Sequence, residues 1–243
     1  MDKVLLVTGA SSDVGIELVK KIYRDYATVY LHYVHMNDKL KELIDEIRRE
    51  VEIFELQADF SDVGEVAKMI DSINKKGKLP NNIVHLPCGR FYLKQFHKDK
   101  WDNYENNFNI SVRSAYEIIK AFLPEMQRQK YGRIVFMLSS VTGGIPPKFQ
   151  SSYVTVKYAL LGMMRSLATE CADKGITVNG ISPDMMETKF LTEIPDLVIE
   201  QNASANPLGR NVKIEEIIPA ISLMLSDESV AMTGQNIMIT GGL

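Results

Sequence analysis

The sequence predicts a single α/β domain built on a doubly wound, Rossmann-type parallel sheet of about seven strands with helices on both faces. Short apolar runs with almost no charge alternate along the chain with longer segments of helical periodicity. Strands buried on both faces need such uncharged runs, and strands that alternate with helices favour a parallel sheet. The apolar runs span residues 4–7, 28–33, 51–56, 83–86, 133–138, 177–181 and 236–239.

The segments between these runs predict helices. In the first of them, Ile16, Val19, Ile22 and Tyr23 share one helix face. Right-handed crossovers leave few topologies for such a chain, of which the doubly wound sheet is the commonest. Because no linker, repeat or low-complexity tract interrupts the pattern, we expect residues 1–243 to form one domain. The expected helices span residues 14–26, 38–49, 63–74, 101–129, 152–173 and 214–225.

Composition limits the classes of function. Of the 243 residues, 45% are apolar and 24% are charged, as in ordinary globular proteins. The formal net charge of −3 offers no basic field to nucleic acid or to an anionic membrane surface. No run approaches about 18 consecutive apolar residues, and the first residues lead directly into a strand. We therefore expect a soluble, cytoplasmic protein that binds neither nucleic acid nor membranes.

Residues that commonly ligate metals are scattered. The two cysteines, Cys88 and Cys171, are too far apart in sequence to suggest a disulfide framework or a zinc site. The four histidines show no ligand spacing. We expect reduced thiols and no bound metal.

A glycine-bearing turn joins the first expected strand to the first expected helix. Its sequence is Thr8-Gly9-Ala10-Ser11-Ser12-Asp13-Val14-Gly15. In such a turn, backbone N–H groups can approach a pyrophosphate at a helix N-terminus. Gly9 permits the tight turn, and Gly15 permits close packing of helix on strand. The alternative is an ordinary strand–helix turn with Asp13 as the helix N-cap. The candidate cofactor-binding residues here are Gly9, Ser11, Ser12, Asp13, Val14 and Gly15.

The pattern Tyr-x-x-x-Lys occurs twice, as Tyr153/Lys157 and Tyr116/Lys120. Both spacings place a phenol and an ammonium group on one helix face. The first pair follows a strand that ends in Ser139-Ser140. That strand end and the following helix N-terminus meet at the edge of the sheet where a cofactor on the glycine turn would present its ring. We therefore favour the first pair as the catalytic one.

These groups suit the reduction of a carbonyl. A ketone that accepts hydride becomes an alkoxide, which needs a proton at once. A phenol is a slow acid at neutral pH, but a nearby ammonium group and a positively charged nicotinamide ring both lower its pKa. A serine hydroxyl can orient the carbonyl oxygen through a hydrogen bond.

The turn and the Ser/Tyr/Lys set resemble those of the short-chain dehydrogenase/reductase family, and of its β-ketoacyl-reductase-like branch in particular. The resemblance spans nearly the whole chain, from Thr8 to Gly242. In that family the serine lies about 13 positions before the tyrosine, which selects Ser140. The resemblance implies NAD- or NADP-dependent hydride transfer between nicotinamide and a ketone or secondary alcohol. Tyr153 would transfer the proton and Ser140 would orient the oxygen, while Lys157 would tune Tyr153 and hold the nicotinamide ribose.

Other family positions are matched by residue type. Asp59 corresponds to an aspartate that contacts the adenine ring, although a simple helix cap would use the same residue. Pro183 and Thr188 correspond to the turn beside the nicotinamide. The catalytic asparagine is matched by Asn109, which we favour, whereas counting back from a downstream proline selects Ser111.

Three departures from the family pattern support a second hypothesis. Asp13 replaces a glycine of the turn, residues 85–89 replace the motif N-N-A-G, and Asp184 replaces the glycine after Pro183. A carboxylate about 5 Å from a phosphate costs about 3 kcal/mol at an effective dielectric near 20, so Asp13 either points away or weakens cofactor binding. The alternative function is a non-catalytic dinucleotide-binding or scaffold protein. A third possibility, a sugar-nucleotide epimerase, would need a larger C-terminal substrate domain.

The choice between NAD and NADP stays open because Tyr33 and Val34, which follow the second strand, are uncharged. His35 or Lys39 is a candidate for a weak phosphate contact or a solvated surface group. We expect the aperiodic segment 188–207 to be a substrate-covering loop. The segment mixes apolar with acidic residues, Phe190 and Glu193 among them. It contains no cluster of arginines, which would indicate a phosphorylated or acyl-carrier substrate. The C-terminal segment resembles the last strand of the family, which suits a homotetramer. A homodimer is the alternative.

Overall fold

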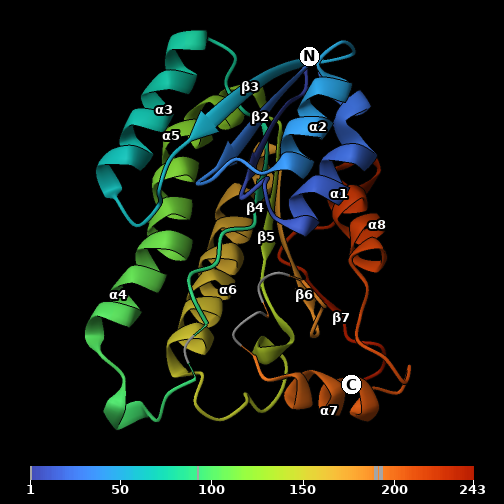
Figure 1. The fold of residues 1–243 in the computed structure, drawn as a ribbon. Helices are drawn as coiled ribbons and strands as arrows, with labels where there is room; N and C mark the ends of the chain where they lie inside the picture. Colours follow the sequence, from blue (N-terminus) through green and yellow to red (C-terminus); the bar gives the residue numbers. More distant parts are fainter. Residues whose placement is uncertain (1, 92, 189–190, 192–193) are drawn as a thin grey trace.

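The computed structural model describes residues 2–91, 93–188, 191 and 194–243. Within these residues, parallel strands form a seven-stranded sheet in the order β3-β2-β1-β4-β5-β6-β7 (Figure 1). The order reverses beside β1, as in doubly wound sheets, which confirms the predicted fold class. The strands are β1 (Val4–Thr8), β2 (Thr28–Tyr33), β3 (Glu52–Gln57), β4 (Asn82–His85), β5 (Gly132–Met137), β6 (Ile176–Pro183) and β7 (Asn236–Ile239).

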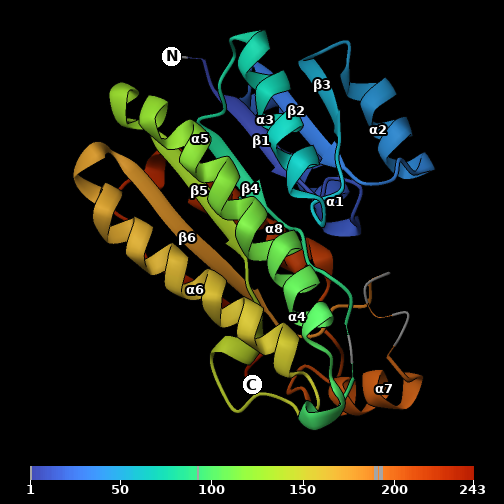
Figure 2. The same ribbon diagram turned by 90° about the vertical axis from the view of Figure 1, so that its left-hand side faces the viewer.

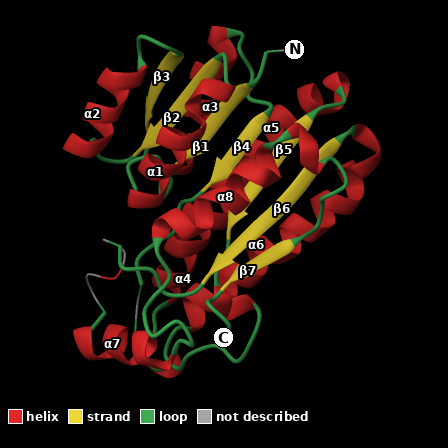
Figure 3. Ribbon diagram, turned by 90° about the vertical axis from the view of Figure 1, so that its right-hand side faces the viewer, coloured by secondary structure: helices red, strands yellow, loops and turns green. Residues whose placement is uncertain are grey.

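Helices cover both faces of the sheet. One layer contains α1 (Asp13–Ile22), α2 (Asp38–Ile47) and α8 (Ile214–Leu225), which lie in front of the sheet in Figure 3. The other contains α3 (Val63–Lys76), α4 (Trp101–Phe108), α5 (Ser114–Gln129) and α6 (Ser151–Cys171), which face the viewer in Figure 2. Within the described parts of the chain, no helix is long and apolar enough to cross a lipid bilayer.

Each face of the sheet buries its own apolar cluster, because successive strand residues point to opposite faces. Leu5 and Val7 of β1 pack beneath α1, α2 and α8. Leu6, between them, packs beneath α3, α5 and α6. This double burial explains why the strands carry so little charge.

The long helix expected over residues 101–129 is interrupted. A π-helical segment, η3 (Asn109–Arg113), separates α4 from α5. The Ser111 carbonyl accepts a hydrogen bond from His85 Nε2 at 2.9 Å, and Ser114 Oγ donates to the Ile110 carbonyl at 2.6 Å. Side chains that bond to a helix carbonyl in this way disturb the regular ladder, and no residue spacing in the sequence reveals them.

The segment 188–207 is not simply a loop, because it contains α7 (Asp196–Ala205). This helix lies beyond the carboxyl ends of the strands (Figure 3) and buries none of its residues. A helix without a buried face needs no apolar periodicity, which is why the sequence pattern missed it. Phe190 and Glu193 lie outside the described residues.

Two buried histidines tie the end of β1 to its neighbours. His32 Nδ1 accepts a hydrogen bond from the Gly9 backbone N–H at 3.1 Å, and its Nε2 lies 2.9 Å from the Ala58 carbonyl. His85 Nδ1 lies 3.0 Å from the Thr8 hydroxyl, while its Nε2 donates to the carbonyl in η3. Burial lowers the pKa of His32 to about 4 and that of His85 to about 3, so both rings are neutral at neutral pH.

These two histidines make stability depend on pH. The folded pKa lies below the unfolded value near 6.5, so the unfolded chain binds more protons as the pH falls. Each ring therefore removes up to about 1.4 kcal/mol of the free energy of unfolding per pH unit below about pH 6.5. Urea unfolding between about pH 7 and pH 5 should show this slope, and His85→Asn should remove its share. His97→Asn, at an exposed site, is the control, and equal slopes in wild type and His85→Asn would contradict the assignment.

Candidate active site

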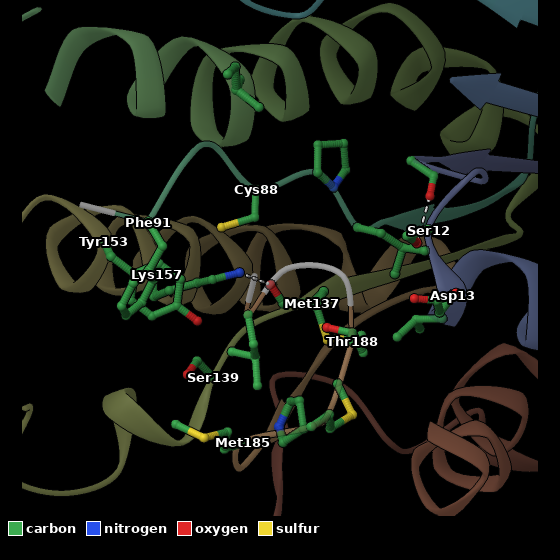
Figure 4. A pocket seen from close by; sticks show the side chains of 18 of the residues that line it. Ser12, Asp13, Cys88, Phe91, Met137, Ser139, Tyr153, Lys157, Met185 and Thr188 are labelled. Atoms are coloured by element: carbon green, nitrogen blue, oxygen red, sulfur yellow. Dashed lines mark hydrogen bonds between the residues drawn. The ribbon is translucent and has the colours of Figure 1, made fainter. Parts of the chain in front are cut away.

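A cavity of about 660 Å³ lies along the carboxyl ends of the central strands. It includes the crevice between β1 and β4 where the strand order reverses, the usual ligand site of open α/β sheets. Figure 4 shows Ser12 and Asp13 of the glycine turn at one end, and Tyr153 and Lys157 at the other. Its volume lies in the range typical of small-molecule sites, and the cavity joins the two motifs that the sequence singled out.

The glycine turn forms the first end of the cavity. Gly9 has a φ of +75°, and a Cβ on Gly15 would lie 2.7 Å from the Ala10 carbonyl oxygen, so both positions require glycine. The helix N-cap is Ser12, not Asp13 as the alternative reading supposed. Its Oγ donates to the Gly9 carbonyl at 2.8 Å and accepts from the Gly15 N–H at 3.0 Å. Gly15 lies behind the turn, whereas Gly9, Ser11, Ser12, Asp13 and Val14 line the cavity.

Asp13, in this turn, forms an ion pair with Lys39. Lys39 Nζ lies 2.9 Å from Asp13 Oδ1. The side chains of Lys39 and Asp13 are 62% and 17% exposed, so water screens the pair in part. The lysine offsets the carboxylate charge that would otherwise oppose a phosphate at this helix N-terminus.

The other predicted cofactor residues also line the cavity. Asp59 lines the cavity, and its Oδ1 accepts a hydrogen bond from the Ser61 N–H at 2.8 Å, which makes a local turn. The N-cap of α3 is Asp62, so Asp59 is not a helix cap. Pro183 and Thr188 lie along the wall that leads to the second end. After β2 the wall is formed by Val34, His35, Met36 and Asn37.

The second end holds a half-buried phenol and a buried ammonium group. Tyr153 and Lys157 lie one turn apart on α6, and Lys157 is 2% exposed. Lys157 Nζ lies 5.6 Å from the centre of the Tyr153 ring and donates to the Met137 carbonyl at 2.8 Å (Figure 4). Phe91 packs edge-on against the Tyr153 ring at 5.1 Å, and Cys88 lines the same end. Phe91 and Cys88 carried no recognisable pattern in the sequence.

Burial controls the protonation of this cluster. It raises the pKa of Tyr153, and a negative charge on Cys88 would raise this pKa further. An interaction with the Ser139 side chain lowers it. Burial lowers the pKa of Lys157 and raises that of the Cys88 thiol. The phenol is therefore protonated at neutral pH, as a proton donor must be.

The two adjacent serines point to different partners. Ser140, which the sequence spacing selected, donates from Oγ to Asp184 Oδ1 at 3.2 Å. Ser139 lies at the same end of the cavity as Tyr153 (Figure 4) and is the serine that interacts with the phenol. Both serines line the cavity.

Neither candidate for the catalytic asparagine reaches the cavity wall. Asn109 begins η3 and Ser111 is fully buried, whereas Ile110 between them lines the cavity. The second Tyr/Lys pair is a surface feature: Tyr116 is 50% exposed, and Lys120 Nζ lies 5.4 Å above its ring. Among the described residues, no group of three or more histidine, cysteine, aspartate or glutamate side chains could hold a metal ion.

A sheet with a glycine turn at one end of a cavity and a Tyr/Lys pair on one helix at the other is typical of a dinucleotide-dependent oxidoreductase. A family model described as "Enoyl-(Acyl carrier protein) reductase" matches residues 9–243. The chain therefore belongs to this family of short-chain dehydrogenases/reductases, which act on CH–OH and C=O groups with a nicotinamide cofactor.

Similar proteins agree with this assignment along their full length. The 3-oxoacyl-[acyl-carrier-protein] reductase FabG of Staphylococcus aureus is 29% identical over 246 residues, covering 100% of this chain and 98% of the relative. The oxidoreductase UcpA of Salmonella typhimurium is 31% identical, covering 99% and 94%. Among solved structures, NAD+-bound xylitol dehydrogenase has a TM-score of 0.87 at 25% identity, covering 99% and 98%.

The Asp13–Lys39 ion pair predicts an effect on cofactor affinity. Lys39→Gln leaves the Asp13 carboxylate less compensated, so the Kd of NADH should rise about fivefold at low salt. The difference should shrink at about 0.5 M salt, because screening weakens exposed charge interactions. A nicotinamide fluorescence titration measures the Kd, with Lys41→Gln on the same helix as the matched control. An unchanged or lower Kd for Lys39→Gln would show that Lys39 does not offset Asp13.

Proposed function

We propose that the chain catalyses the reversible reduction of an apolar ketone to a secondary alcohol, with Tyr153 as the proton donor. The observation that carries this proposal is the placement of a half-buried phenol beside a buried ammonium group at the end of the cavity opposite the glycine turn. An alkoxide formed there would have a proton donor and a positive charge within reach.

Each end of the cavity has residues that fit a dinucleotide. The N-terminus of α1, which begins at Asp13 after the N-cap Ser12, suits a pyrophosphate. Lys157 is positioned to hold ribose hydroxyls while its charge favours ionisation of Tyr153. Bound NAD or NADP supplies or accepts the hydride. We propose no direct contact between Asn109 and the substrate, because Asn109 is not among the residues that line the cavity.

We propose no strong preference between NAD and NADP. A carboxylate after β2 would accept the 2′-hydroxyl of NAD, and an arginine would pair with the 2′-phosphate of NADP. The wall there carries neither, since it is made by Val34, His35, Met36 and Asn37. Two similar solved structures contain bound NAD, a xylitol dehydrogenase and a 3-oxoacyl-[acyl-carrier protein] reductase from Brucella melitensis.

The substrate class follows from the wall around Tyr153. Apolar side chains surround that end, so a ketone with aliphatic or cyclic apolar substituents is the best match. The 3-oxoacyl thioesters named for several relatives belong to this broad class. The apolar residues that line the cavity include Phe91, which packs against the Tyr153 ring, and Leu93, Pro147, Met185, Leu191, Ile194 and Val198.

We further propose a cytoplasmic protein whose 243 residues act as one domain, assembled as a homotetramer or homodimer. Phe108, Tyr116 and Tyr158 are 43%, 50% and 44% exposed on α4, α5 and α6, which lie side by side (Figure 2). Large apolar groups on one surface are typical of subunit interfaces. Light scattering of the purified protein should give the mass of two or four chains, and the mass of a single chain would contradict this proposal.

The non-catalytic alternative loses its main support. Asp13 is paired with Lys39, and Asp184 accepts a hydrogen bond from Ser140, so both departures from the family pattern have partners in the structure. A pure binding protein would have no need of a buried ammonium group beside a phenol that lines the cavity.

The two tyrosine pairs provide a matched test. Tyr153→Phe should lower kcat for ketone reduction by about 10²–10⁴-fold, the usual contribution of a general acid, with NADH binding retained. Tyr116→Phe removes the same hydroxyl from an exposed ring and should leave kcat within about twofold. Loss of NADH absorbance with a panel of aliphatic and cyclic ketones measures kcat. Equal losses in two folded variants would exclude Tyr153 as the specific proton donor.

A further inference from the structure

Asn107 on α4 holds the segment that follows β4. Its side chain is 3% exposed, and its Nδ2 donates to the Arg90 carbonyl at 3.1 Å. Its Oδ1 lies so close to Gly89 that a Cβ there would be 1.9 Å away, so this close approach needs glycine. One buried amide therefore holds residues 89–90 against α4, although Asn107 is not among the residues that line the cavity.

Phe91 comes next in the chain and forms part of the cavity wall. The carbonyl of Arg90 and the N–H of Phe91 belong to one planar peptide group, so the hydrogen bond from Asn107 also fixes the backbone that enters Phe91. Farther along, the Lys94 N–H donates to the Phe149 carbonyl at 2.9 Å. Phe91 therefore lies between two positions that hydrogen bonds hold in place.

The rings of Phe91 and Tyr153 meet as an edge-to-face pair. Their centroids are 5.1 Å apart, and their planes are inclined by 63°. Figure 4 shows both residues near Lys157, at the end of the cavity opposite the glycine turn. An aromatic corner therefore lies where the proposed function puts the substrate carbonyl.

We propose that Phe91 determines substrate specificity by favouring ketones with a planar, unsaturated ring beside the carbonyl, and that Asn107 is the positioning residue that keeps Phe91 in place. This inference rests on the proposed function, because it takes the carbonyl oxygen to lie at Tyr153. It narrows the proposed substrate class from apolar ketones in general to those with a flat ring.

The physical reason is the charge distribution of aromatic rings. The face of such a ring is electron-rich and its edge is electropositive, so two rings attract each other in edge-to-face or offset stacked arrangements. A flat substrate ring in the corner can contact Phe91 in one of these ways. A saturated ring carries hydrogens on both faces and gains only from the burial of apolar area. Aliphatic wall residues such as Leu93 offer both kinds of ring that same non-directional gain.

The test compares two methyl ketones with the same number of carbon atoms, acetophenone and cyclohexyl methyl ketone, in the full chain with NADH. Selectivity is the ratio of their kcat/KM values, and its change between variants cancels their different intrinsic reactivities. Phe91→Leu should lower the ratio about fivefold, the size of one aromatic contact, whereas Phe91→Tyr keeps the ring and should hold it within about twofold. Phe96→Leu is the matched control, because Phe96 is 77% exposed and does not line the cavity.

A double-mutant cycle tests the role of Asn107. Asn107→Asp keeps the size of the side chain but replaces the Nδ2 donor with an acceptor. It should lower the ratio by at least about twofold in the wild-type background and leave it unchanged in Phe91→Leu, because it acts through Phe91. A general loosening of the fold would lower kcat/KM for both ketones and would act equally in both backgrounds. Equal effects in the two backgrounds would therefore exclude Asn107 as the positioning residue.

The outcomes separate this inference from the proposed function. An unchanged ratio in Phe91→Leu, an equal fall in Phe96→Leu, or a wild type that reduces other ketones but not acetophenone would overturn this inference alone. Retained activity in Tyr153→Phe, measured alongside, would instead overturn the proposed function. NADH binding checks that each variant is folded. If Asn107→Asp fails this check, Phe91→Leu, which keeps an apolar side chain, decides the role of Phe91 by itself.

Discussion

A buried ammonium group is the constraint on which the catalytic edge of the sheet depends. Lys157 is 2% exposed, and an unpaired charge at such a position would cost several kcal/mol. The carbonyl of Met137, at the end of β5, accepts its hydrogen bond at 2.8 Å. This bond helps to hold α6 against the edge of the sheet. Tyr153, one turn earlier on the same helix, therefore lies at the end of the cavity opposite the glycine turn.

The departures from the family pattern are accommodated by specific partners. The carboxylate of Asp13 is matched by Lys39 at the first end of the cavity, and that of Asp184 by amide and hydroxyl donors at the second. His85, the first residue of the segment that replaces the family motif, connects β1 to η3 as a neutral ring. Each substitution keeps the local geometry while changing which group satisfies the backbone or the charge.

The fold could be predicted from the sequence because it depends on local patterns, whereas parts of the site could not. Uncharged runs and helical spacing are visible along the chain, and the Tyr153/Lys157 pair needs only an i,i+4 relation and a preceding strand. The hydrogen bond of Ser140 joins it to Asp184, 44 residues away in sequence, and the break at η3 depends on a hydrogen bond from His85, 26 residues away in sequence. Helix α7 left no periodic signal because polar side chains, rather than a buried face, hold it in place.

The most direct test of this account is an ultraviolet difference titration of Tyr153, taken as wild type minus Tyr153→Phe, with and without the oxidised cofactor. Without cofactor, burial should keep this phenol protonated up to about pH 10, its ordinary pKa. With the cofactor bound, the positive nicotinamide ring should lower the pKa by at least about one unit. Ionisation at the same pH in both states, with cofactor binding shown independently, would contradict the placement of the ring beside Tyr153 and Lys157.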